Sequence, residues 1–183
     1  MELELKAEHA RLNAYVAVTV AIISVVTALG NIKNSNIAQQ MAFTKGNSVD
    51  VWNEYQATKI KLHTDEDALG TISLSNGSDA VRGAETKRLQ KKIAKYDVES
   101  KELMEKAKGE DEHYGRLDLH HEQLDMAEAF NSIGISLAAV AALTDLFWLL
   151  CVSWGFGALG FTMAALAFAG STFHPDLLMR WLS

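Results

Sequence analysis

The chain has 183 residues, of which 49% are hydrophobic and 22% are charged, and its formal net charge is −6. An acidic chain with both signs mixed lacks the basic patch that nucleic-acid-binding domains present, so nucleic acid is not a predicted partner. A single cysteine, Cys151, excludes an intrachain disulfide.

The first apolar segment runs from Leu12 to Ile32 without a charged residue. About 20 such residues, rising ~1.5 Å each in a helix, cross ~30 Å of hydrocarbon. A cleaved signal peptide would have a shorter apolar region, of ~7–15 residues, and a small-residue cleavage site that is missing here. Residues 1–33 are therefore predicted to hold one transmembrane helix. Its small side chains recur at steps of three and four and predict a face for close helix packing: Ala17, Ala21, Ser24 and Ala28.

Residues 34–128 form the polar middle of the chain. Between Lys33 and Glu128 there are fourteen Lys and Arg against eighteen Asp and Glu. The absence of proline before Pro175 allows long continuous helices. A loop is predicted at about residues 63–84, where glycine, serine and aspartate gather. The middle is therefore predicted to be two long helices that form an antiparallel hairpin outside the membrane.

Side chains recur at steps of three and four along both arms of this hairpin. In the second arm they form an a/d seam typical of a coiled coil, and its predicted packing residues are Leu89, Ile93, Tyr96 and Leu103. Polar members of the seam, such as Ser100 and His121, leave little apolar surface for one isolated hairpin to bury. Further copies of the chain are therefore predicted partners.

Residues 129–183 contain a second apolar region, in which Asp145 is the one charge between Ala129 and Phe173. This region is too long for one membrane crossing and suits two that are joined by a tight turn. Either Asp145 or the glycine cluster at 155–160 can supply the turn. We favour Asp145, because a carboxylate at mid-membrane is costly whereas one at a turn reaches water. The predicted spans are residues 129–143 and 147–170, with Gly134 and Ala138 as helix-packing positions.

Candidate sites for ions and metals are weak. If Asp145 lies within the membrane instead, it forms an ion or proton site with Ser132 and Ser136 on the preceding span. His121 and Asp125 are four residues apart, so they share a helix face that a metal can use, although such pairs are also common at a wet membrane interface.

Catalytic and cofactor motifs are not found. There is no phosphate-binding glycine loop, zinc-protease motif or nucleophile elbow, so the chain is not predicted to be an enzyme and no cofactor is predicted. His9 and His174 lie near predicted membrane boundaries and are alternative heme ligands, but isolated histidines at such depths are more often interfacial.

Two segments, residues 36–61 and 120–150, resemble a family of bacterial inner-membrane proteins of unknown function. That family has one span, a coiled-coil-like middle and then a two-span hairpin. The resemblance rests on about a dozen positions. They include Asn36, Ala38, Trp52, Tyr55, Gln56, Ala57, Ile60, Lys61, His121, Asp125, Ala127, Glu128 and Ala129. The family has no assigned activity, so the resemblance implies an architecture and a location without a reaction.

The family also suggests an orientation in the membrane. Its members place arginines in the turn between spans two and three, which implies a cytoplasmic turn, a cytoplasmic N-terminus and a periplasmic hairpin. This chain has Thr144, Asp145 and Leu146 there, so that support is missing. Lys6 and Arg11 before the first span nearly balance Lys33 and Lys45 after it, and we choose the cytoplasmic N-terminus.

The sequence therefore predicts an all-α membrane protein with three transmembrane helices and a long extramembrane antiparallel helical hairpin. The favoured function is an oligomeric membrane scaffold or accessory subunit that binds further copies, or another membrane or envelope protein, through helix contacts. One alternative is a small homo-oligomeric channel or transporter that uses the polar faces of the spans. A second is a metal- or heme-binding redox subunit.

Overall fold

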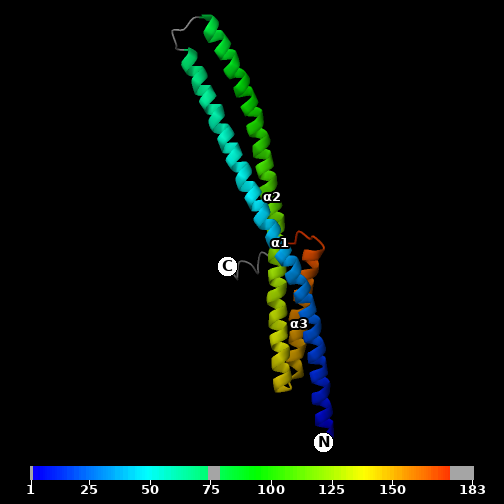
Figure 1. Ribbon diagram of the computed structural model, residues 1–183. Coiled ribbons are helices and arrows are strands. Elements are labelled where there is room, and N and C mark those ends of the chain that lie inside the picture. Colours follow the sequence, from blue (N-terminus) through cyan, green and yellow to red (C-terminus); the bar gives the residue numbers. More distant parts are fainter. Residues whose placement is uncertain (1, 74–78, 174–183) are drawn as a thin grey trace. The chain divides into compact units, whose positions relative to one another are not determined.

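A computed structural model describes residues 2–73 and 79–173, and all of its regular structure is helical (Figure 1). The chain forms α1 (Glu2–Ser73), α2 (Asp79–Thr144) and α3 (Phe147–Phe168). Each of the three helices contains a segment long and apolar enough to cross a membrane. The predicted all-α architecture, with two long helices that form a hairpin, is therefore confirmed.

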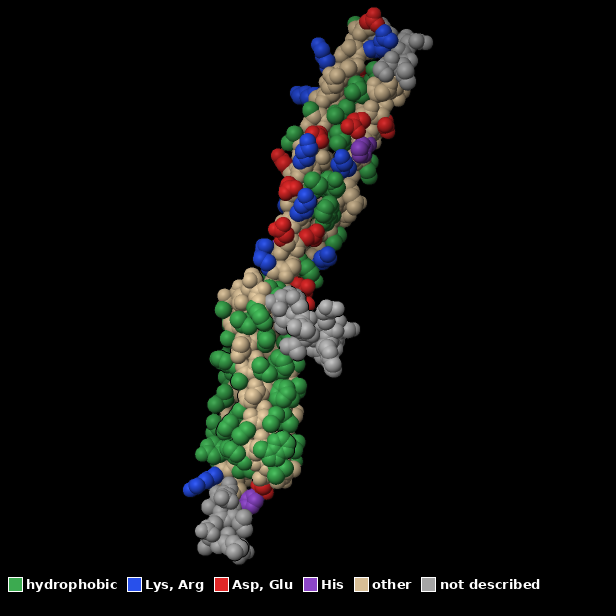
Figure 2. Space-filling view, turned by 180° about the vertical axis from the view of Figure 1, so that it is seen from behind, with side chains coloured by type: hydrophobic (Ala, Val, Ile, Leu, Met, Phe, Trp, Pro, Cys, Tyr) green, Lys and Arg blue, Asp and Glu red, His purple; other side chains and the backbone are tan. Residues whose placement is uncertain are grey.

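The chain divides into two compact units. Residues 1–41 and 116–183 form the first, which we call the apolar unit, and residues 42–115 form the second, which we call the arm unit. Helices α1 and α2 contribute to both units, and α3 belongs to the apolar unit. In Figure 2 the surface of the apolar unit is mainly hydrophobic, while the arm unit carries charges of both signs.

The predicted loop at 63–84 is too long. Helix α1 continues to Ser73 and α2 begins at Asp79, so most of that segment is helical. Polar side chains there support the helix, because Thr64 Oγ1 donates to the Ile60 carbonyl at 2.8 Å and Thr71 Oγ1 donates to that of Asp67 at 2.9 Å. Asp79 in the first turn of α2 also interacts favourably with the helix dipole.

The arm unit is an antiparallel pair of helices (Figure 1). The buried side chains of each helix repeat at steps of three, four or seven. All the seam positions predicted for α2 within the arm unit are buried or half-buried, including Leu89, Ile93, Tyr96 and Leu103. The opposing face of α1 is partly polar. Its buried residues are Thr44, Ser48, Val51, Thr58 and Leu62.

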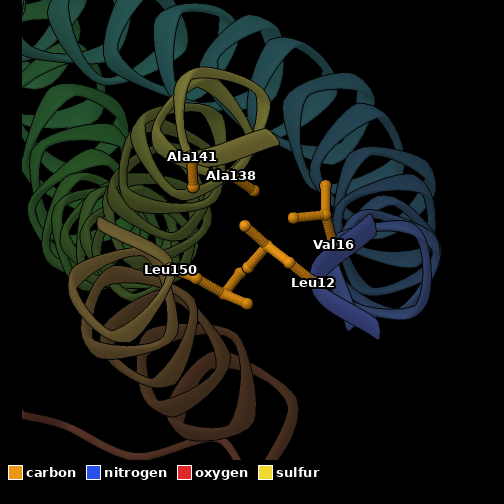
Figure 3. Packing of buried hydrophobic residues seen from close by; sticks show 5 residues of the cluster. All are labelled: Leu12, Val16, Ala138, Ala141 and Leu150. Atoms are coloured by element: carbon orange, nitrogen blue, oxygen red, sulfur yellow. The ribbon is translucent and has the colours of Figure 1, made fainter. Parts of the chain in front are cut away.

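The apolar unit packs α1, α2 and α3 together through small and medium-sized side chains. At one end Leu12 and Val16 of α1 meet Ala138 and Ala141 of α2 and Leu150 of α3 (Figure 3). A second cluster joins α2 to α3 through Met126, Ala127, Met163 and Ala164. Because alanine at these positions has no bulk beyond Cβ, the helix backbones can approach closely.

Two glycines allow the backbones of α2 and α3 to approach closely. A Cβ added to Gly134 would lie 3.2 Å from the Ser153 carbonyl, and one added to Gly160 would lie 3.0 Å from the Ala127 carbonyl. The buried Ser153 hydroxyl donates to the Gly134 carbonyl at 2.7 Å. The predicted packing positions Gly134 and Ala138 are therefore buried against the chain's own helices.

The chain reverses between α2 and α3 at Asp145, where φ is 55°. Aspartate is one of the few side chains that enter this left-handed region readily, because it can bond locally. The turn predicted at Asp145 is therefore confirmed, and the glycines of α3 lie within a continuous helix.

The arm seam can be tested at Leu62, which is 3% exposed, against Ile60, which is 67% exposed two residues away. Leu62→Ala should destabilise the arm unit by about 2 kcal/mol or more through a lost side chain and a cavity. That corresponds to a drop of about 30-fold or more in amide hydrogen-exchange protection. Ile60→Ala should leave protection nearly unchanged, and an equal loss in the two variants would contradict the seam.

Candidate functional site

A cluster of polar side chains joins α1 to α2 at one end of the apolar unit, and we call it the polar collar. Asn34 Nδ2 donates to Asp125 Oδ1 at 2.6 Å, and Asn34 Oδ1 contacts His121 Nδ1. Three residues earlier on α1, the Asn31 carboxamide donates to Glu128 Oε1 at 3.4 Å. The collar residues Asn31, Asn34, His121 and Glu128 line a shallow depression of about 160 Å³.

The collar includes the two predicted metal ligands, His121 and Asp125. His121 Nε2 lies 3.7 Å from Asp125 Oδ2, so the pair is close but is already occupied by Asn34. Among the described residues, no group of three or more His, Cys, Asp or Glu side chains is arranged to hold a metal ion. The collar has the geometry of an interhelical polar contact.

The C-terminal end of α3 is closed by two side chains from the other helices. Lys33 Nζ donates to the Ala167 carbonyl at 2.8 Å and lies 4.3 Å from the centre of the Phe168 ring. Gln123, which is fully buried, donates from Nε2 to the carbonyls of Ser171 at 3.1 Å and Phe173 at 2.6 Å. A cation at a helix C-terminus is favoured by the helix dipole.

An apolar groove lies between α1 and α3, with α2 at its base. Its volume is about 220 Å³, and it opens at the surface beside Ile22 and Phe161, which are both 59% exposed. Trp154 Nε1 donates to Thr19 Oγ1 at 2.8 Å and so ties α3 to α1 within the groove wall. The lining residues are Thr19, Ile22, Ile23, Val26, Asn131, Trp154, Gly157 and Phe161.

Asn131 is the polar residue that α2 contributes to this groove. It is 2% exposed, and within the described part of the chain its carboxamide has no hydrogen-bond partner. Its Oδ1 lies directly against Gly160, where an added Cβ would overlap it. Gly160 therefore makes the room that the Asn131 side chain occupies.

The face of α1 that carries the predicted small side chains, which we call the small face, is exposed throughout. Ala17, Ala21, Ser24 and Ala28 all face away from the chain's own helices. The face that α1 does bury is a different one, formed by Leu12, Val16, Thr19 and Ile23.

The predicted ion-site residues are not brought together. Asp145 contacts His9, with Oδ1 and Nδ1 2.6 Å apart, and both side chains are about half exposed. Ser136 Oγ donates to the Ser132 carbonyl of its own helix at 2.8 Å. His174, the alternative heme ligand, lies outside the described residues.

The arm unit has one polar contact of note, centred on Asp111 of α2. Ser48 Oγ donates to Asp111 Oδ1 at 2.6 Å, and Trp52 Nε1 donates to Asp111 Oδ2 at 3.0 Å. These two hydrogen bonds, with a smaller contribution from the positive charge of Lys45, lower the pKa of Asp111 from its ordinary value of 3.8. The contact fixes α1 against α2 at a seam where the side chains are small.

A family model described as a domain of unknown function, DUF4337, matches residues 12–170. The chain belongs to this family. Neither a curated protein nor a solved structure matches this chain. The resemblance to a family of unknown function that residues 36–61 and 120–150 indicated is therefore confirmed, and the family brings no activity with it.

In this DUF4337 chain, sequence reasoning missed the groove, the α3 cap and the Asp111 contact. The sequence analysis did not single out Asn131, whose only signal is a carboxamide within an otherwise apolar segment. Lys33 was used only as a topology signal, although a lysine just after a span suits a helix C-terminus. Asp111 gave no signal, because its partners are about sixty residues earlier.

The close approach at Gly160 predicts a specific loss of stability. Gly160→Ala should lower the thermal midpoint of the purified protein by several degrees, because the new methyl group meets Asn131 and the Ala127 carbonyl in a buried contact. Gly155→Ala on the same helix is the control, since nothing lies within 4 Å of its Cβ position. There alanine should leave the midpoint unchanged or raise it. Equal midpoints in the two variants would contradict the contact.

The Asp111 contact predicts a loss of arm-unit stability in acid. Because the pKa of Asp111 is lower in the folded chain, its stabilisation is complete above 3.8 and is lost as the pH falls below that value through the folded-state pKa. The measurement is the tryptophan fluorescence of the wild type minus that of Trp52→Phe, followed from pH 6 to pH 2. Asp111→Asn should remove the transition below pH 3.8, and a transition that persists in this variant would show that another group causes it.

Proposed function

We propose that this chain is an oligomeric integral membrane scaffold or accessory subunit of the bacterial inner membrane. It acts through helix contacts and has no catalytic activity. The observation that carries the proposal is the exposed small face of α1, which none of the chain's own helices uses.

Membrane residence is supported by the surface of the apolar unit. Large apolar side chains such as Val25, Leu29, Leu143 and Trp148 are exposed there, an arrangement that suits lipid and is unfavourable in water. Three exposed hydroxyl groups of the spans, those of Ser136, Thr144 and Thr162, bond to carbonyls of their own helix at 2.8 Å. Hydrocarbon requires such internal satisfaction of polar groups.

The proposed orientation is the one that the family's pattern implies, although this chain lacks the family's arginines in the turn between α2 and α3. In this proposal the N-terminus is cytoplasmic and the arm unit lies in the periplasm. The polar collar and the Lys33 cap of α3 then belong to the periplasmic interface, and the His9–Asp145 contact belongs to the cytoplasmic one. Each charged group among these residues thus has access to water or to a partner, which avoids the cost of an isolated charge in hydrocarbon.

Self-association through α1 is supported by the geometry of its two faces. Ala21 lies two residues from both Thr19 and Ile23, about 200° around the helix, so it is opposite the face that packs inside the chain. Moving an apolar helix surface from lipid to another helix releases little hydrophobic free energy. Membrane helices therefore associate mainly through close packing of small side chains. A second copy of α1 is the simplest partner for this face.

The arm unit adds surface for further contacts. Phe43 and Ile60 are exposed large apolar side chains on α1, and Val98 is one on α2. Glu99 has a buried carboxylate oxygen that lacks a hydrogen-bond partner in the described part of the chain. Another helix packed here would stabilise the arm unit by covering the apolar side chains and by donating a hydrogen bond to Glu99.

Cysteine cross-linking in native membranes tests the oligomer. In a Cys151→Ser background, Ala21→Cys should form covalent dimers with a short bifunctional maleimide. Ile22→Cys, at the same depth but about 100° around the helix, should give at least fivefold less dimer. Equal yields at the two positions would remove α1 from the interface. A monomeric mass of the wild-type protein in lipid nanodiscs would contradict the scaffold itself.

A further inference from the structure

The groove between α1 and α3 has the features of a lipid-chain site. We propose that it binds one acyl chain of a membrane phospholipid, whose ester carbonyl accepts a hydrogen bond from the Asn131 carboxamide. This inference rests on the proposed membrane insertion and is independent of oligomerisation.

The need for a ligand comes from Asn131. Its carboxamide is almost fully buried and faces the groove without a hydrogen-bond partner among the described residues. Nearly all buried side-chain amides in folded proteins have such a partner, since leaving one unpaired is costly. The other polar groups of the groove wall, Trp154 Nε1 and Thr19 Oγ1, are bonded to each other. A ligand carbonyl could accept a hydrogen bond from Asn131 Nδ2.

The size and shape of the groove favour a single hydrocarbon chain. Its volume of about 220 Å³ is below the ~300–1,000 Å³ of pockets that enclose a whole drug-sized molecule. It also exceeds the ~150 Å³ of an apolar cavity that accepts benzene. Its lining on α1 extends from Thr19 to Val26, which is ~10 Å along the helix axis. The groove is thus an elongated apolar channel with an open side.

The depth of Asn131 suits an ester carbonyl. Asn131 lies three residues beyond Glu128 of the polar collar, which is ~4.5 Å deeper along α2. The interfacial layer of a bilayer is ~5–7 Å thick on each side, and the ester groups lie at its inner boundary. With the collar at headgroup level, Asn131 is therefore level with the carbonyls, and the groove continues toward the bilayer centre.

The experiment uses the full chain in nanodiscs with a photoreactive phosphatidylethanolamine. One probe carries a diazirine next to the ester carbonyl and a second carries it at the end of the same chain. The first should label α2 and α3 around Asn131, and the second should label near Trp154. A diazirine-bearing quinone with an isoprenoid tail forms a separate arm, and preferential groove labelling by it would overturn the assignment to phospholipid.

Two variants and one control test the site itself. Asn131→Leu should reduce labelling by the first probe about fivefold, as expected for one lost hydrogen bond. Ile22→Trp should cover the mouth of the groove and reduce labelling by both probes at least fivefold. Leu29→Trp is the control, since Leu29 is similarly exposed on the same face two turns away and does not line the groove. It should label like the wild type.

Besides preferential labelling by the quinone, three results would overturn the inference. Labelling spread evenly over the exposed apolar residues would mean surface lipid only. Equal labelling of the wild type and Ile22→Trp would mean that the groove is not the site. Groove labels on a neighbouring copy would mean that a second chain fills it. Failure of the chain to enter nanodiscs is different, because it contradicts the proposed membrane function.

Discussion

The structure depends on one repeated contact, the seam along which α1 packs against its neighbours. In each unit the buried side chains of α1 follow steps of three, four or seven. The composition of the buried face differs between the units: it is mainly aliphatic in the apolar unit, as at Val16, whereas the arm unit mixes short polar residues such as Ser48 with aliphatic ones such as Leu62. A helix that packs along one line leaves its opposite side exposed. That constraint makes the small face of α1 available to another chain.

Polar groups in the apolar unit are satisfied mainly by local partners. Hydroxyls such as that of Thr162 bond to their own helix, and the collar carboxylates of Asp125 and Glu128 bond to asparagines of α1. Asp145 contacts His9 at the turn. Asn131 differs from these residues, because its side chain is buried without a hydrogen-bond partner in the described part of the chain, and it led to the lipid site. The scaffold and lipid proposals thus arise from surfaces that the chain leaves unpaired.

Much of the fold could be predicted from the sequence because its signals are periodic and long. The turn at Asp145 followed from the cost of a buried carboxylate, and the α2 seam from its spacing. The loop at 63–84 was overestimated, because residues such as Thr64 and Thr71 bond back to their own helix. The candidate sites were mostly unpredictable, because they join residues far apart in the chain: Lys33 with Ala167, and Asn131 with Gly160. Such contacts depend on helix rotation, which hydropathy does not specify.

The central claim is that all three helices cross a bilayer, and spin-label accessibility in nanodiscs tests it most directly. The exposed native Cys151 reports on α3, and Val25→Cys and Val140→Cys report on α1 and α2 in a Cys151→Ser background. At these three positions the spin label should collide more often with oxygen than with a water-soluble nickel chelate. At Ile60→Cys in the arm unit, in the same Cys151→Ser background, the order should reverse. A water-type response at Cys151, Val25 or Val140 would contradict the account.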